Sequence, residues 1–268
     1  MCKKVYCLLI VCFLLFLAQS TVYALDFTFD TDNQGWRSGR IGYNGGSYER
    51  LYPGVPADWK AELAGHQGVI YQDGTTNPEG RPYALGIWQD KAFMGLLNGK
   101  TLVADVYSTG NWRTWVGEQV FARWYISELL YIDQDGHPYY NMWVSKAAVG
   151  IDMNALKGWG TFSIEMKETN FFKWPNYNLP GTFDEVLKNY DTIGLSLFSD
   201  TDNLECLNGG DCTWGPEKTL LHYGAYATEG TATWALDNVR AVPEPSTLIL
   251  LGGAGLIVLR LRRHLLRN

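Results

Sequence analysis

The sequence is poor in the residues on which many enzyme sites and nucleic-acid surfaces depend. It has four histidines in 268 residues, and only two of its five cysteines lie beyond residue 12. It contains no Gly-x-Ser-x-Gly elbow and no phosphate-binding loop. Lys and Arg (22) are outnumbered by Asp and Glu (28). The acidic balance argues against nucleic acid as a partner, because binding to phosphates depends on Lys and Arg.

Long apolar runs are also scarce, and both lie at the ends of the chain. The first, Val5 to Leu17, follows Lys3 and Lys4 and precedes Val22-Tyr23-Ala24. A positive start, a short apolar run and a site ending in a small residue are typical of a secretory signal peptide. We therefore expect a signal helix within residues 1–24, with cleavage after Ala24.

The second apolar run, Leu248 to Leu259, lies between a proline-rich motif and a basic end. Pro243, Glu244 and Pro245 precede the run, and Arg260, Arg262 and Arg263 follow it. The run is about a dozen residues long, whereas a comfortable transmembrane helix needs about 20. Basic residues next to such a segment favour the cytoplasmic side. An ordinary C-terminal membrane anchor remains the alternative for residues 243–268.

Together, these three parts resemble the PEP-CTERM sorting signal of exported bacterial proteins. The resemblance implies that a membrane-embedded exosortase processes the tail. It also implies export across the inner membrane of a Gram-negative-type bacterium, to the envelope or the medium. The C-terminal membrane helix would then be a transient tether.

Between the two ends, residues 25–242 form one predicted domain. It holds 16 Lys and Arg against 27 Asp and Glu, a formal charge of −11. Cys206 and Cys212 remain in it, with five residues between them that include Gly209 and Gly210. In an oxidising compartment such an even pair predicts a local disulfide, with two free thiols as the alternative. Neither cysteine has further Cys or His at zinc-ligand spacing.

The pattern of this domain predicts an all-β fold. Short runs rich in β-branched and aromatic residues alternate with turns of Gly, Asn, Asp and Pro, and Thr161–Met166 alternates most regularly. We expect an antiparallel β-sandwich of the jelly-roll type. One short helix is predicted after Pro180-Gly181, because Thr182 and Glu185 have the spacing of a capping box.

Three segments are similar to laminin-B-like and galactose-binding-like jelly rolls. They are Phe27-Thr28-Phe29-Asp30 with Gly35-Trp36 near the start, the segment from Phe183 to Ile193, and Trp234-Ala235-Leu236-Asp237-Asn238-Val239 near the end. Related domains commonly hold a structural calcium ion between their first and last strands. The resemblance therefore implies a calcium site with Asp30, Glu49 and Asp237 as candidate ligands, since calcium prefers oxygen ligands.

All eleven tryptophans lie within the predicted domain. Aromatic faces stack on sugar rings, and the densest cluster places Trp112, Arg113 and Trp115 together. We expect these three to form a carbohydrate-binding wall with a polar arm. Core packing is the alternative for any single ring, and Trp36, Trp159 and Trp234 are expected in the core.

The sequence favours a non-catalytic function. Glu165 and Glu168 do not have the spacing that places two acids on one face of a strand, as a glycosidase pair would require. His66, His137 and His222 have no identifiable nucleophile partner. The leading hypothesis is an envelope or matrix protein that binds or organises exopolysaccharide. A polysaccharide hydrolase and a purely structural surface protein remain open.

Overall fold

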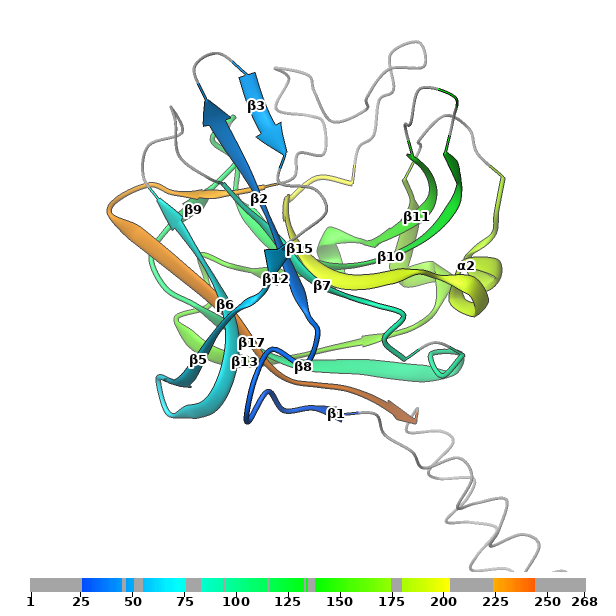
Figure 1. Cartoon of the computed structure of the whole chain (residues 1–268), viewed down its shortest axis with the longest axis horizontal. Coiled ribbons are helices and arrows are strands. Elements are labelled where there is room, and N and C mark those ends of the chain that lie inside the picture. The colour runs from blue at the N-terminus through cyan, green and yellow to red at the C-terminus, as the bar shows by residue number, and fades with distance from the viewer. Residues whose placement is uncertain are drawn as a thin grey trace, which may run out of the picture.

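The computed structural model describes residues 26–44, 47–50, 55–75, 83–93, 95–114, 116–132, 134, 138–174, 180–202 and 224–243. These residues form two stacked antiparallel sheets with one short α-helix (Figure 1). The predicted antiparallel β-sandwich is therefore confirmed. The predicted signal and membrane helices lie outside the described residues. Within the described residues, no helix is long and apolar enough to cross a bilayer.

Sheet A has six strands in the order β13-β8-β17-β6-β5, with β1 also paired to β17. Its strands are β1 (Asp26–Phe27), β5 (Asp58–Leu63), β6 (His66–Thr75), β8 (Lys100–Ser108), β13 (Gly158–Glu165) and β17 (Thr231–Pro243). The first and last strands of the domain are therefore neighbours, with Asp26 opposite Arg240. This pairing brings both ends of the described chain to one end of the molecule (Figure 1).

Sheet B has nine strands in the order β14-β11-β10-β15-β7-β2-β3, with β12 paired to β10 and β4 paired to β2. Its strands are β2 (Arg37–Asn44), β3 (Ser47–Arg50), β4 (Val55–Pro56), β7 (Tyr83–Asp90), β10 (Val120–Ile132), β11 (Pro138–Ser145), β12 (Ile151–Asp152), β14 (Phe171–Lys173) and β15 (Thr192–Ser199). A separate two-stranded ribbon joins β9 (Trp112–Arg113) to β16 (Tyr226–Ala227).

The core lies between the two sheets, because each long strand sends alternate residues inward. In β8, Leu102, Ala104 and Val106 are buried in this core, whereas Asp105 and Tyr107 lie on the opposite face and are half-buried. Burial of one large apolar side chain stabilises a fold by about 1.5–3 kcal/mol. The fully buried large side chains include Trp36, Trp112, Trp124 and Trp234.

Helix α2 (Phe183–Asn189) has the predicted capping box at its start. The Thr182 hydroxyl accepts from the Glu185 backbone N–H at 3.2 Å, and the Glu185 carboxylate accepts from the Thr182 N–H at 2.7 Å. Phe183, Val186 and Leu187 are buried, so the helix closes one end of the core. Two 3-10 helices, η1 (Ala147–Val149) and η2 (Glu168–Asn170), complete the regular elements.

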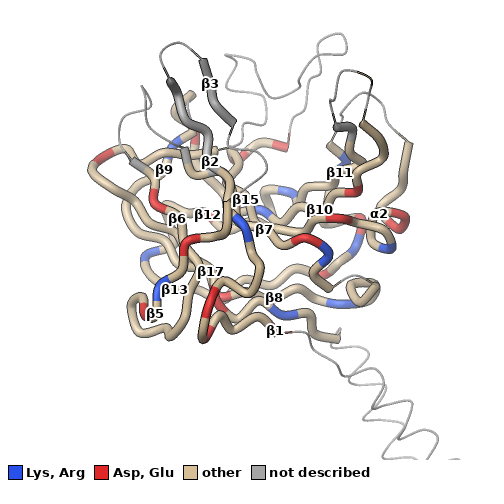
Figure 2. Tube along the Cα trace, viewed as in Figure 1, with Lys and Arg blue, Asp and Glu red and all other residues tan. Residues whose placement is uncertain are grey.

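Acidic and basic residues are interspersed along both layers (Figure 2).

Candidate functional site

The outer face of sheet A carries a row of aromatic side chains that crosses four neighbouring strands. Trp159 of β13 is opposite Tyr107 of β8, which is opposite Ala235 of β17, which is opposite Tyr71 of β6. Residues directly opposite one another in antiparallel strands share one face of the sheet. We call these four residues the aromatic row. Its three aromatic members are half-buried, Ala235 is fully buried, and Lys60 Nζ lies 3.8 Å from the centroid of the Tyr71 ring.

Polar side chains border the aromatic row on both sides. On one side, a second row of paired residues lies two positions along the strands from the aromatic row, and it consists of Thr161, Asp105 and Asp237. On the other side Thr233 is opposite Asp73, and its hydroxyl donates to the Asp73 carboxylate at 2.5 Å. The face therefore combines rings with hydroxyl and carboxylate groups, which are the two chemistries that sugar hydroxyls and ring faces require.

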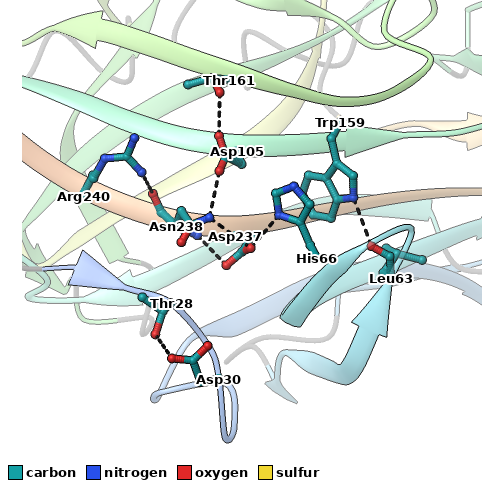
Figure 3. A network of polar contacts seen from close by, with 10 residues as sticks. All are labelled: Thr28, Asp30, Leu63, His66, Asp105, Trp159, Thr161, Asp237, Asn238 and Arg240. Atoms are coloured by element: carbon teal, nitrogen blue, oxygen red, sulfur yellow. Dashed lines mark hydrogen bonds and ion pairs between the residues drawn. The ribbon is translucent and has the colours of Figure 1, made fainter.

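The turn between β5 and β6 extends over this face and supports Trp159 (Figure 3). The His66 ring stacks on the Trp159 ring, with centroids 3.9 Å apart and an interplanar angle of 17°. The Trp159 indole N–H donates to the Leu63 carbonyl at 3.1 Å. Ala64 and Gly65 form the turn with positive φ values of 49° and 91°. His66 therefore covers one face of the Trp159 ring. The Tyr107 ring also packs against the Trp159 ring, with the two ring centroids 5.1 Å apart.

Beneath this turn lies a continuous polar network centred on Asp237 (Figure 3). His66 Nδ1 lies 2.7 Å from Asp237 Oδ2, and the Asn238 backbone N–H donates to Asp237 Oδ1 at 2.7 Å. The Asn238 side-chain amide donates to Asp105 Oδ2 at 2.9 Å and to Asp237 Oδ2 at 3.2 Å. Thr161 donates its hydroxyl to Asp105 Oδ1 at 2.7 Å.

A β-bulge makes this network possible. The register of β17 against β8 shifts between Asp237 and Arg240, and Asn238 has a left-handed φ of 50°. Asn adopts this conformation more readily than most residues with a Cβ. The bulge turns the Asn238 amide toward both aspartates.

The electrostatics of Asp237 reflect its nearly complete burial, at 4% exposed. Burial raises the pKa of Asp237, because desolvation disfavours the ionised carboxylate. The hydrogen bonds from His66 and from the Asn238 N–H lower the pKa and oppose this effect, while the neighbouring Asp105 charge adds to it. Burial is the largest of these contributions, so the pKa stays above its ordinary value.

Asp105 and Asp237 are neighbouring carboxylates, but both are used in hydrogen bonds that link the strands. Each of their four oxygens accepts at least one hydrogen bond from Thr161, Asn238 or His66. A glycosidase pair needs one carboxyl group free to protonate the leaving oxygen and another facing the sugar. The observed arrangement favours holding β8, β17 and β6 in register.

Trp112 requires a correction to the predicted binding wall. Its ring is fully buried, and its indole N–H donates to the Ser108 hydroxyl at 3.2 Å. The ring lies so close to Gly74 that a Cβ there would be 2.4 Å from it. A buried ring cannot stack on a sugar. Arg113 is exposed on β9, and Trp115 lies outside the described residues.

Trp159 requires a correction in the opposite sense. It was expected in the core but lies half-buried on the outer face, whereas Trp36 and Trp234 are fully buried as expected. The alternation of β13 contained the signal for this difference. Phe162 and Ile164 are buried even-numbered positions, so odd-numbered Trp159 points the other way. Sequence reasoning also missed Tyr107 and Tyr71, for which the same parity argument holds.

The described residues do not test the predicted calcium site, because one of its three candidate ligands is a side chain outside them. Asp30 is exposed and accepts the Thr28 hydroxyl at 2.7 Å, while the oxygens of Asp237 accept from N–H donors. The described residues contain no group of three or more His, Cys, Asp or Glu that could hold a metal. The side chain of Glu49 lies outside the described residues. The calcium site therefore stays a prediction.

Several other predicted residues lie outside the described part of the chain. They are Cys206, Cys212, Glu244, Pro245, Arg260, Arg262 and Arg263. Pro243 is described and is the last residue of β17. The predicted disulfide and the membrane-flanking role of the arginines remain predictions.

Comparison with known proteins identifies the C-terminal segment. The family described as PEP-CTERM protein-sorting motif matches residues 241–263. The chain is therefore an antiparallel β-sandwich protein that carries a PEP-CTERM sorting motif. No curated protein matches the chain.

Several solved structures share a distant similarity with the fold. One is the family 11 carbohydrate-binding module of the cellulosomal cellulase Lic26A-Cel5E of Clostridium thermocellum, at 15% identity and a TM-score of 0.41, covering 83% of this chain and 95% of the module. The family 11 module in complex with a β-1,3-1,4-mixed-linked tetrasaccharide has 16% identity and a TM-score of 0.40, with coverage of 81% and 95%. The CBM22-1–GH10 modules of Clostridium thermocellum xylanase 10B have 14% identity and a TM-score of 0.34, with coverage of 82% and 28%. Similarity this distant transfers no ligand to this chain.

Proposed function

We propose that this protein is an exported, non-catalytic glycan-binding protein of the cell envelope, with exopolysaccharide as its ligand. The observation that supports this most directly is the aromatic row on the outer face of sheet A. Trp159, Tyr107 and Tyr71 lie along one line across the strands, with polar rows beside them.

The spacing of the row suits an extended ligand. Tyr107 and Tyr71 are separated by β17, so their strands are two interstrand distances apart, about 9–10 Å. Ala235 lies between them and has no bulky side chain. Lys60 Nζ lies over one face of Tyr71, 3.8 Å from the ring centroid, and the remaining surface of the two half-buried rings supports successive apolar sugar faces. The Asp73 carboxylate beside them offers a partner for hydroxyl groups.

The same face also supports a non-catalytic role. Each oxygen of the Asp105 and Asp237 carboxylates already accepts a hydrogen bond, and Asp237 is nearly inaccessible. Binding needs only the half-exposed rings and the polar groups at the rim. The rival hydrolase would need Asp237 to leave its bonds to His66 and Asn238 before it could reach a substrate.

Export and processing follow from the sorting motif. We propose that an exosortase acts on the tail after the domain has crossed the inner membrane of a Gram-negative-type cell. The apolar run from Leu248 to Leu259 then acts as a transient membrane tether for the acidic domain. The match over residues 241–263 supports this route.

The binding proposal is tested with Tyr107→Ala and Tyr71→Ala, singly and combined. We expect the double variant to bind the producing strain's exopolysaccharide at least about 10-fold more weakly, the size of loss typical for truncating a central aromatic contact. Affinity electrophoresis in gels with and without the polysaccharide measures the change.

Tyr131→Ala provides the matched control, because Tyr131 is a 48% exposed tyrosine on β10 of the other sheet. It should leave mobility in the polysaccharide gel unchanged, and thermal melting confirms that all variants are folded. If the wild-type protein is folded but binds none of the polysaccharide, the purely structural role is favoured. Release of reducing sugar by the wild-type protein would support the hydrolase instead.

A further inference from the structure

The sorting motif begins within the folded sheet. Strand β17 continues to Pro243, with Val242 opposite Thr101 and Pro243 opposite Lys100 of β8. The motif match starts at Ala241, which is only 4% exposed. The domain and the motif are therefore joined without a linker.

This direct connection limits how far the domain can stand from a membrane. Five peptide steps separate Pro243 from Leu248, the first residue of the apolar run. At no more than about 3.6 Å per residue they span at most about 18 Å. A headgroup layer occupies roughly 5–8 Å of that distance on each side of the hydrocarbon core. While the apolar run is in the bilayer, the end of β17 must lie within about 10–13 Å of the headgroups.

The surface at this end of the domain is built around the connection between β7 and β8. We call residues 91–93 and 95–99 the β7–β8 turn. Phe93 packs edge-on against Phe27 of β1 with centroids 5.3 Å apart, and Leu97 is fully buried. Leu96 N–H donates to the Phe93 carbonyl at 2.8 Å, and Lys100 N–H donates to the Leu97 carbonyl at 3.1 Å. These contacts place the turn beside β1 and the end of β17 (Figure 1).

The β7–β8 turn exposes one apolar residue that has a lysine on either side of it in the sequence. Leu96 is 41% exposed, although the residues on which the turn rests are buried. Lys91 and Lys100 flank it, and the exposed acids nearby are Asp26 at the start of β1 and Asp90 at the end of β7, which is paired with Arg37 at 3.5 Å. Glu165, at the same end of sheet A, is paired with Lys167 at 2.6 Å. Two basic residues therefore lie on either side of the exposed leucine, at the end of the domain where the tail begins.

We propose that the β7–β8 turn is a membrane-contact surface that rests on the headgroups of an anionic bilayer while the tail is tethered. Leu96 enters the interface, and Lys91 and Lys100 lie against anionic headgroups, which attract basic side chains. This contact rests on the proposed membrane tether. It orients the sandwich with the β10–β11 hairpin at the opposite end from the membrane (Figure 1).

The test places a photo-crosslinking amino acid at Leu96 of the full chain, reconstituted in vesicles of phosphatidylethanolamine and phosphatidylglycerol. Ile132 is the matched control, since it is an apolar residue of 60% exposure on β10, near the β10–β11 hairpin end. We expect lipid adducts at position 96 to exceed those at position 132 at least about fivefold, because tether geometry keeps only the first position within reach.

A second variant inserts a flexible Gly-Ser segment of about 12 residues between Pro243 and Glu244. It should retain vesicle association but lose most of the adduct at position 96. Equal adduct yields at positions 96 and 132 would overturn the contact, as would adducts to protein in place of lipid or a yield unchanged by the insertion. Failure of the unmodified chain to associate with vesicles would overturn the tether together with the contact, whereas the Tyr107 and Tyr71 variants test glycan binding independently of either.

Discussion

At the residue scale, Gly68 shows how closely the first turn of the domain is packed against sheet A. Its φ is +64°, and a Cβ at this position would lie 2.3 Å from the Phe29 carbonyl oxygen and 2.7 Å from the Asp30 Cα. Both contacts are with backbone, which cannot move aside as a flexible side chain can. The turn at Phe29–Asp30 and strand β6 can therefore approach this closely only when residue 68 is glycine.

We predict that Gly68→Ala lowers the free energy of unfolding by roughly 3 kcal/mol or more, from backbone strain and steric overlap together. Gly65→Ala is the control. Gly65 also has a positive φ, +91°, but no atom lies within 4 Å of the added Cβ. Its cost should be only the conformational strain of about 1–2 kcal/mol. Urea unfolding measures both variants, and equal losses would contradict the role of the close contact.

The same scale explains why single aromatic residues were partly misassigned from the sequence. Trp112 stands next to an arginine in a short run with turn residues around it, which indicates exposure, yet β9 points its ring into the core. Trp159 belongs to a strand whose alternation places it outward, yet its size suggested the core. Strand parity was the better guide in the second case, while nothing local predicts the pairing of β9 with β16.

At the element scale, helix α2 depends on the charge state of one capping side chain. The pKa of Glu185 is lowered, chiefly by the hydrogen bond from the Thr182 backbone N–H and then by the Thr182 hydroxyl. A carboxyl group whose pKa is lower in the folded state stabilises the fold above its unfolded-state pKa. That contribution is lost as the pH falls through the folded-state pKa.

We therefore predict that Glu185→Gln destabilises the domain more at about pH 7 than at about pH 3, because the contribution begins to fall below the ordinary glutamate pKa of about 4.3 and is lost completely only below the lower folded-state pKa. Thr182→Ala should cost about 1 kcal/mol through loss of the hydroxyl cap. Because the hydroxyl does not titrate, most of its cost should persist at both pH values. Urea midpoints at the two pH values provide the measurement, and a Glu185→Gln effect that is constant with pH would contradict the ionic contribution.

The elements most readily predicted were those whose evidence is local. The capping box at Thr182 and Glu185 and the alternation in Thr161–Met166 both lie within a few residues of chain, and both elements form as expected. The order of strands depends on contacts between distant residues. The pairing of Asp26 with Arg240 and of Asp105 with Asp237 could not be derived from either segment alone.

At the scale of the whole molecule, the calcium prediction concerns how the first and last strands are joined. Binding at Asp237 would require its carboxylate to exchange hydrogen bonds from His66 and Asn238 for the metal. If the site predicted from Asp30, Glu49 and Asp237 exists, calcium should raise the melting temperature and a chelator should reverse the rise. Asp237→Asn should abolish the calcium-dependent part of the shift. Melting curves that coincide with and without calcium would contradict the site.

Also at this scale, strand β17 connects three features of the protein. It lies between β8 and β6, its bulge supplies the Asp237–Asn238 network, and its end enters the sorting motif. Removal of the tail after Pro243 would therefore leave the sheet complete. A cut several residues earlier would remove part of a strand that pairs with both β8 and β1.

The sequence by itself determined the all-β class, the capped helix and the sorting motif, because each is encoded in residues close together along the chain. It also indicated an aromatic-rich domain suited to glycans. Only the tertiary structure decided which rings lie on a surface, since that depends on which strands become neighbours. Trp159, Tyr107 and Tyr71 come from three separate strands, and they form one row only because hydrogen-bond register aligns those strands with β17.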